Sequence, residues 1–286
     1  MVRRKSILNK TLDLALRISP RLKRSLVRIW YELMSALDKE ELLVYMNFGY
    51  VDLNPDAKEI ELRDGDEKNR YCIQMYHHVA GSIDLKGLDV LEVGCGRGGG
   101  ASYIMRYLKP KSMTGVDIAE KAIAFCKRYH TVEGLSFRYG DAESLPFEDN
   151  TFDVIVNIES SQCYGSIPRF LGEVYRILRP NGYFLFADHR SKEGVEILRR
   201  QVTNSDLALL KEEKINANVL KALDLDNERK LRLIQQKVPK LLMKPFQEFA
   251  GIRGTGLYED LRTGALEYRS FILYKREVQE GKPVSE

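Results

Sequence analysis

A glycine-rich turn after a short apolar run carries the clearest chemical signal in this chain of 286 residues. Gly94, Gly96 and Gly98 allow the backbone to approach a ligand closely and to adopt positive φ. Glu92 ends the apolar run two residues before the first of these glycines. A carboxylate there can accept hydrogen bonds from the turn and order the cationic end of a ligand. Residues 88–102 are therefore predicted to hold a small charged ligand.

Two further acidic residues follow the next predicted strands and extend this site. Asp117 can accept both hydroxyls of a ribose, and Asp141 can accept from the amino group of an adenine. The same glycines also satisfy the dinucleotide fingerprint, which would predict a nicotinamide cofactor. The carboxylate of Glu92 would repel a pyrophosphate, whereas S-adenosylmethionine (SAM) has no phosphate. The pattern therefore favours SAM over a nicotinamide cofactor.

Short β-branched runs alternate with helical stretches from residue 88 onward, which is typical of a parallel sheet with crossover helices. Such sheets bind ligands at the carboxyl ends of their strands. The predicted strands are Asp89–Val93, Ser112–Val116, Leu135–Tyr139, Val154–Ile158 and Tyr183–Ala187. The predicted helices are Gly100–Leu108, Glu120–Tyr129 and Pro168–Leu178.

Beyond residue 190 the leucines recur at helical spacing among many charged residues, which predicts a helical cap beside the site. Two final strands are predicted over Gln247–Arg253 and Leu266–Lys275. The fold class is therefore α/β: a doubly wound, mostly parallel seven-stranded sheet with N-terminal helices and a helical cap insertion. The predicted segments are a basic amphipathic arm (1–35), a cofactor-binding core with an N-terminal lid segment (36–190), the cap (191–245), C-terminal strands (246–276) and a flexible tail (277–286).

The composition is that of a globular protein, 44% hydrophobic and 30% charged. No apolar run approaches the roughly 20 residues that span a bilayer, and the N-terminus has no apolar signal core. The four cysteines form no C-x-x-C pair, so we expect reduced thiols, no metal site and a cytoplasmic location.

Basic residues concentrate in residues 1–30, which carry nine Lys or Arg and one Asp, a net charge of +8. The whole chain is +4, so the remainder carries −4. The amphipathic pattern fits a helix packed on the body or a helix lying on an anionic membrane surface, and both interpretations stay open. The negative body and the absence of an Asn-Pro-Pro-Tyr motif argue against a nucleic-acid partner.

Four segments match the motifs of class I SAM-dependent methyltransferases, which the chain resembles: Leu91–Tyr103, Gly140–Phe147, Phe152–Asn157 and Leu178–Gly182. Over about residues 27–276 it is similar to the phthiotriol/phenolphthiotriol dimycocerosate methyltransferases, which O-methylate long-chain lipid diols. Further matches to that family are Met46–Tyr50, Asn69–Tyr71, Met75–His77, Ile215–Ala217 and Gly254–Thr255.

The resemblance implies a Rossmann-like fold, SAM as cofactor, and O-methylation of a hydroxyl on a hydrophobic lipid, polyketide or related small molecule. Two alternatives remain: N- or C-methylation of a small molecule, and a SAM-fold protein that transfers no methyl group, such as a cyclase or a lipid binder. The implied cofactor-binding residues are Glu92, Gly94, Gly96, Gly98, Asp117, Ile118, Asp141, Ala142 and Asn157.

An alcohol acceptor needs its proton taken by a residue of suitable pKa. His189, with Asp188 beside it, ends the fifth predicted strand and is the first candidate, although neighbouring strand residues face opposite sides. The resembled family usually has a histidine where this chain has Gln162, and a glutamine can orient a hydroxyl but cannot take its proton. The predicted catalytic set is His189, Asp188 and Gln162.

Aromatic residues on either side of the cofactor turn can wall an apolar substrate pocket. Tyr50, Tyr71, His77 and Tyr164 are the predicted pocket residues, and plain core packing is the alternative for each. His77 or its neighbour His78 is also a second candidate for the proton acceptor.

Overall fold

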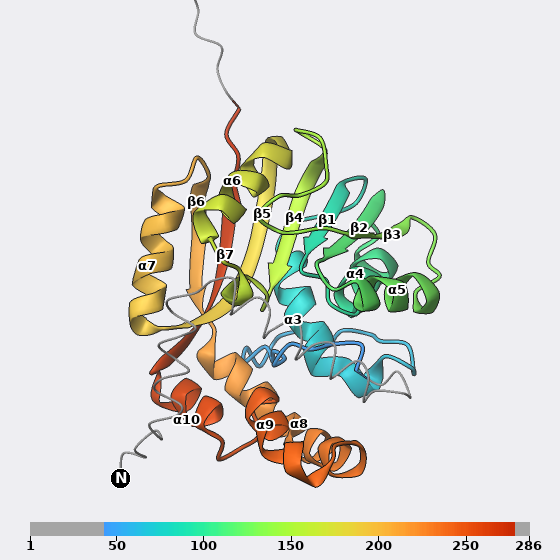
Figure 1. Ribbon diagram of the computed structural model, residues 1–286, viewed down its shortest axis with the longest axis vertical. Coiled ribbons are helices and arrows are strands. Elements are labelled where there is room, and N and C mark those ends of the chain that lie inside the picture. Colours follow the sequence, from blue (N-terminus) through green and yellow to red (C-terminus); the bar gives the residue numbers. More distant parts are fainter. Residues whose placement is uncertain (1–42, 278–286) are drawn as a thin grey trace, which may run out of the picture.

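The computed structural model describes residues 43–277, whose arrangement Figure 1 shows. The predicted basic arm over residues 1–35 and its membrane contact lie outside the described residues, as does the predicted tail beyond residue 277.

The core is a seven-stranded sheet with the strand order β3-β2-β1-β4-β5-β7-β6 (Figure 1). Neighbouring strands are parallel except at β7, which runs antiparallel to both β5 and β6. The predicted mostly parallel seven-stranded sheet is thereby confirmed. The strands are β1 (Asp89–Val93), β2 (Ser112–Asp117), β3 (Leu135–Tyr139), β4 (Phe152–Ile158), β5 (Leu178–Ser191), β6 (Ala208–Lys214) and β7 (Leu266–Tyr274).

Helices cover both faces of this sheet. Alternate residues of one strand enter different cores: Val90 packs with α3, α4 and α5, whereas Leu91 packs with α6 and α7. Both residues are fully buried, as expected for a parallel strand covered on two sides. The five helices are α3 (Arg70–Ala80), α4 (Gly99–Tyr103, continued by a turn of π-helix over Ile104–Leu108), α5 (Glu120–Tyr129), α6 (Ile167–Ile177) and α7 (Lys192–Thr203).

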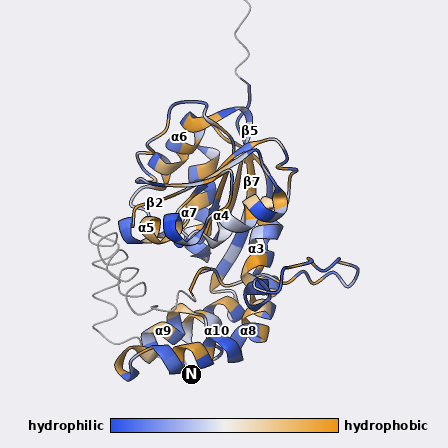
Figure 2. Cartoon of the chain, turned by 90° about the vertical axis from the view of Figure 1, so that its right-hand side faces the viewer, coloured by the Kyte–Doolittle hydropathy of each residue, from blue (hydrophilic) through white to orange (hydrophobic). Residues whose placement is uncertain are grey.

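A third group of helices lies beyond the carboxyl ends of the parallel strands, below the sheet in Figure 1 and apart from it in Figure 2. It has a small apolar core of its own, formed by Ile234, Val238, Phe246 and Ile252. The group comprises α8 (Asn216–Lys237), α9 (Met243–Phe249) and α10 (Gly256–Thr263).

The five core strands and three helices predicted from the sequence are present, with β5 longer than the Tyr183–Ala187 expected. Two predictions are wrong. Residues 247–253 form no strand but fall in α9 and the turn after it, because Phe246 packs against α8 instead of a sheet. The stretch 191–245 is no continuous helical cap: α7 covers the sheet, β6 joins it, and only α8 and α9 lie beyond the strand ends.

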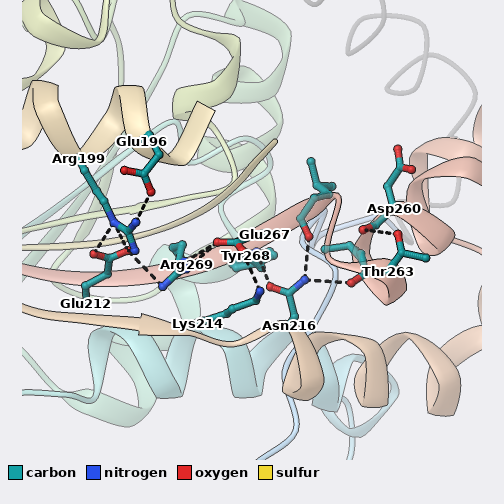
Figure 3. A network of polar contacts seen from close by, with 12 residues as sticks. Glu196, Arg199, Glu212, Lys214, Asn216, Asp260, Thr263, Glu267, Tyr268 and Arg269 are labelled. Carbon is teal, nitrogen blue, oxygen red and sulfur yellow. Dashed lines mark hydrogen bonds and ion pairs between the residues drawn. The ribbon is translucent and has the colours of Figure 1, made fainter. Parts of the chain in front are cut away.

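The prediction of a helical cap failed because part of this stretch, β6, pairs with the edge of the sheet. Leu209 and Leu210, whose spacing suggested a helix, lie on β6 and are exposed by 45% and 57%. β6 is held by long-range ion pairs (Figure 3): the Glu212 carboxylate lies 2.8 Å from the Arg199 guanidinium of α7 and 3.3 Å from that of Arg269 of β7. Ion pairs with other elements do not affect the local periodicity of the sequence, so that periodicity did not reveal this strand.

Asn216 ties the start of α8 to the sheet, and its loss should destabilise the fold. Its Nδ2 donates to the carbonyls of Leu261 and Leu266 at 3.0 and 2.8 Å, and its Oδ1 accepts from the amide of Tyr268 at 2.8 Å (Figure 3). Asn216→Ala leaves these buried groups unpaired and is expected to cost about 2–4 kcal/mol. Urea denaturation measures this, and the exposed Gln235→Ala on the same helix should change stability by less than about 0.5 kcal/mol. Equal effects of the two changes would contradict the prediction.

Candidate active site

The turn after β1 can contain only glycine at its first position. Gly94 has φ +74°, and its amide and that of Cys95 both donate to the Val116 carbonyl, at 2.8 and 3.1 Å. A Cβ atom at Gly94 would lie 2.3 Å from the Ser160 hydroxyl and 2.8 Å from that of Tyr164. Backbone conformation and crowding therefore both exclude a side chain at this position.

Asn157, near the end of β4, supports this turn through hydrogen bonds of its side-chain amide. Its Nδ2 donates to the Val93 carbonyl at 2.9 Å and lies 2.7 Å from the Ser160 hydroxyl and 2.9 Å from that of Tyr164. A carbonyl can only accept, so the contact with Val93 fixes which end of the amide faces the turn. The buried Oδ1 has no hydrogen-bond partner among residues 43–277 and is available to a donor from a ligand.

Asp117 and Ile118, at the end of β2, lie beside the turn as predicted. The Asp117 carboxylate accepts the amides of Gly96 and Ala119 at 2.9 and 2.8 Å. Burial raises the pKa of this carboxyl, and the amides oppose that shift by stabilising the charged form. Ile118 is a large apolar side chain with 41% exposure, the kind of surface on which an aromatic ring packs.

The predicted adenine-binding residues follow β3, next to Asp117. The amide of Gly140 donates to the Asp117 carbonyl at 3.1 Å, which joins the two strand ends. The Asp141 Oδ1 accepts the amide of Glu143 at 2.9 Å, and Ala142 is 9% exposed. The structure thus brings the acids of β2 and β3 to one side of the glycine turn.

Glu92 is fully buried behind the turn. Its Oε1 accepts the Tyr76 hydroxyl at 2.7 Å, and its Oε2 has no partner among the described residues. Burial raises the pKa of this carboxyl to about 7, although the bond from Tyr76 lowers it. A carboxyl in this state is stabilised by a cationic ligand group, because such a group compensates the buried charge.

Residues 44–46, within the predicted lid segment, lie against the glycine turn. The Met46 methyl group is 2.6 Å from the position a Cβ would take at Gly96. At Gly99 a Cβ would lie 2.7 Å from the Val44 carbonyl and 2.9 Å from the Tyr45 ring. The glycines therefore make room for this segment as well as for a ligand.

A second cluster gathers at the carboxyl ends of β4 and β5. The His189 ring stacks on Phe48 with 5.1 Å between centroids and lies 5.9 Å from the ring of Tyr268. Burial lowers the pKa of His189 to about 4, against the charge of Asp188, so the imidazole is neutral at neutral pH. Its ring makes no hydrogen bond within residues 43–277, which leaves a lone pair for a substrate.

Glu159 belongs to this cluster, and the sequence analysis did not select it. Its Oε1 accepts the amide of Phe48 and the hydroxyl of Tyr268, both at 2.8 Å. Burial raises the pKa of this carboxyl to about 8, which these bonds oppose. Its φ of +50° is unusual for a residue other than glycine and marks a constrained position directly after β4. The residue type and its place at a strand end were the only signals in the sequence.

Asp188 and His189 face opposite sides of β5, as predicted. The Asp188 carboxylate lies 3.0 Å from the Arg190 guanidinium and accepts the Ser161 hydroxyl at 2.7 Å and the Gln162 amide at 3.0 Å. Despite burial, these partners lower the pKa of Asp188, which is therefore held as the charged member of an ion pair. Its contacts orient the loop that carries Gln162.

The predicted pocket residues divide into three places. Tyr50 stacks on His78 at 4.1 Å, and its amide donates to the Tyr71 carbonyl at 2.9 Å, so Tyr50 lies against the first turn of α3, which contains Tyr71. Tyr164 supports the glycine turn. His77 is exposed and bonds to the Tyr103 hydroxyl of α4 at 2.8 Å. The structure therefore does not bring His77 to the strand ends.

Within residues 43–277 no group of three His, Cys, Asp or Glu side chains could hold a metal ion. All four cysteines lie in this range and are free.

Comparison with known proteins finds methyltransferases that are similar to this chain over most of its length. A family model described as a methyltransferase domain matches residues 91–186. Phthiotriol/phenolphthiotriol dimycocerosates methyltransferase of Mycobacterium tuberculosis is 40% identical over 248 residues, 87% of this chain and 91% of the relative. Fatty-acid O-methyltransferase of Mycolicibacterium smegmatis is 37% identical over 261 residues, 91% of this chain and 94% of the relative.

Solved structures agree on the fold. The cyclase SpnF matches with a TM-score of 0.63 and 18% identity, covering 87% of this chain and 95% of that one. Geranyl diphosphate C-methyltransferase from Streptomyces coelicolor A3(2), solved with S-adenosyl-L-homocysteine, matches with a TM-score of 0.61 and 14% identity, covering 88% and 98%. At these identities the likeness shows the fold alone.

The sheet order, the glycine turn and the acids beside it define a class I methyltransferase of Rossmann-like fold. The chain belongs to the family of the phthiotriol/phenolphthiotriol dimycocerosates methyltransferases.

Replacing Gly94 tests the cofactor turn. Gly94→Ala must displace Ser160 and Tyr164, so we expect calorimetric titration to show at least tenfold weaker binding of S-adenosylhomocysteine. Gly87→Ala is the matched control, because Gly87 has a similar φ of +81° but no atom within 4 Å of the added Cβ. It should cost about 1 kcal/mol of stability through backbone strain and leave binding unchanged. Normal binding by a folded Gly94→Ala protein would rule out the proposed role of the turn.

Proposed function

We propose that this chain transfers the methyl group of SAM to a hydroxyl of a hydrophobic lipid. Two family members over nearly the same length have names that specify a phthiotriol-type lipid and a fatty acid as substrates. The choice of an oxygen acceptor rests on the neutral imidazole of His189. This residue lies near the carboxyl end of β5, beside the carboxyl end of β4. An alcohol, unlike an amine that is already deprotonated, requires such a proton acceptor.

The cofactor is proposed to be held by the glycine turn, with the ribose hydroxyls on Asp117 and the adenine beside Ile118, Asp141 and Ala142. Two buried oxygens that have no hydrogen-bond partner among residues 43–277 support this, since Asn157 Oδ1 and Glu92 Oε2 can accept from the cationic amino-acid end. When bound, SAM supplies an electrophilic methyl group on a sulfonium.

His189 is proposed to take the proton of the acceptor hydroxyl. Its stacking on Phe48 fixes the ring plane, and the carboxylate of Asp188 stabilises the imidazolium as it forms. Gln162 is proposed to orient the acceptor oxygen, because its loop is anchored through its own amide to Asp188. Tyr50 and Tyr71 are proposed to contribute apolar surface for the lipid chain.

The remaining sequence-based proposals concern the surroundings of the enzyme. The basic arm over residues 1–30 is proposed to contact a membrane surface, and a cytoplasmic location stays a prediction. No helix within residues 43–277 is long and apolar enough to cross a membrane.

Product analysis tests the function directly. The purified protein is incubated with SAM and a long-chain lipid carrying a secondary hydroxyl, and with the corresponding ketone as the matched control. We expect release of S-adenosylhomocysteine and a lipid heavier by one CH₂ group, bonded to oxygen, with the hydroxyl lipid only. A methyl group on carbon or nitrogen would indicate a different acceptor, and no methyl transfer to any lipid would support a cyclase or a binding protein.

His189→Ala should lower kcat by about 100-fold or more while leaving the KM for SAM unchanged, because the proton acceptor is lost. An imidazole accepts protons only above its pKa, so wild-type activity should fall as the pH drops through about 4, well below the usual 6.5 of histidine. His77→Gln, on the exposed side of α3, is the control and should keep wild-type kinetics. Steady-state rates of His189→Ala near those of the parent would remove His189 from the mechanism.

A further inference from the structure

The charged side chains at the end of α8 and the start of α9 are all positive. Residues 229–247 contain six Lys or Arg and no Asp or Glu. Arg229 and Lys230, at the N-terminal end of this stretch, both pair with Asp226 one turn earlier. Neither Lys240 nor Lys244 forms an ion pair within residues 43–277, and both are exposed. The charges of Lys240 and Lys244 therefore face solvent without compensation from residues 43–277.

A leucine lies in the middle of these lysines. Leu241 is 89% exposed, the largest exposure of any large apolar residue among those described, and it lies between Lys240 and Lys244 with Lys237 four residues earlier. We refer to Lys237, Lys240, Leu241 and Lys244 as the basic tip. An exposed leucine ringed by lysines is the arrangement that lets an apolar side chain enter a bilayer while cations meet phosphate headgroups.

The basic tip connects to the active site through apolar packing. The core of this helical group, Val238 and Phe246 among its members, has Leu242 and Met243 packed against it on the tip side. Met46 packs on the same core and reaches the position above Gly96 in the cofactor turn. One continuous run of apolar side chains thus extends from the tip to the turn, and Figure 2 shows this helical group projecting from the sheet domain.

We propose that the basic tip docks the enzyme on an anionic lipid bilayer, with Leu241 inserted among the acyl chains. The charge selects a bilayer rather than a neutral apolar partner, and the single protruding leucine is suited to a deformable acyl layer rather than to a structured protein groove. The role of this docking rests on the proposed lipid substrate, which would pass from the bilayer to the active site without crossing water. The docking itself does not depend on that substrate.

Local fluorescence separates this contact from any contact of the N-terminal arm. The chain has one tryptophan, Trp30, so Trp30→Phe combined with Leu241→Trp reports on the tip alone. Vesicles of phosphatidylglycerol and phosphatidylcholine should shift its emission to the blue, and brominated acyl chains should quench it. Leu225→Trp is the matched control: Leu225 is 49% exposed on α8, about 18 Å from the end of that helix, beside Asp224 and Asp226. Its emission should not change.

Binding strength provides the second measurement. Changing Lys237, Lys240 and Lys244 together to Gln should weaken partitioning onto these vesicles by about tenfold or more. The same number of changes at the exposed Lys86, Lys111 and Lys192 should have a much smaller effect. Pure phosphatidylcholine vesicles should bind weakly in every case.

Several results would overturn the proposal. Vesicle binding with unchanged Leu241→Trp emission would assign the contact to the arm, and emission already blue-shifted in buffer would mean that this chain covers the tip itself. A blue shift with an oligonucleotide instead of vesicles would point to another polyanion. Activity on a short-chain hydroxyl lipid in detergent needs no bilayer, so it tests the proposed function separately from the docking.

Discussion

The crowding around Gly94 is the constraint on which the rest of the site depends. The amide of this residue bonds to β2, a Cβ added to it would clash with side chains of the loop after β4, and Asn157 holds the preceding carbonyl. Three neighbouring strand ends are thereby fixed relative to one another at one point. Asp117, which would bind the ribose, and the loop after β4, which contacts Asp188, are both linked to this junction.

Buried ionisable groups at the strand ends have different environments, and the differences suggest different roles. Asp188 is ion-paired and has a lowered pKa, whereas burial raises the pKa of Glu92 and Glu159 to about 7 and about 8. Burial without an ionic partner costs folding energy, which a bound cation can recover. His189 is kept neutral by the same burial. These environments fit the proposed cationic cofactor, with an unprotonated imidazole at the neighbouring strand end.

The core could be predicted from sequence because its strands and helices show local periodicity. Asp89–Val93 and Glu120–Tyr129 have the predicted limits, and the glycine spacing predicted the tight turn after β1. The final strand was also predicted, over Leu266–Lys275 against the observed Leu266–Tyr274, but the edge strand β6 could not be predicted in this way. β6 shows 45–57% exposure at its leucines and is held by ion pairs to distant elements, so its pattern resembles that of a charged helix. The contact of Glu159 with Phe48 could not be predicted, because only the fold brings residues 111 positions apart together.

The most direct test of the central claim is the affinity of Asn157→Asp for S-adenosylhomocysteine. This change keeps the size of the side chain but turns the group facing the Val93 carbonyl from a donor into an acceptor, so the turn should lose its support. We predict at least tenfold weaker binding by calorimetric titration, in a protein whose circular dichroism spectrum matches the parent. Unchanged affinity in such a folded variant would contradict the account of how the turn is held for its cofactor.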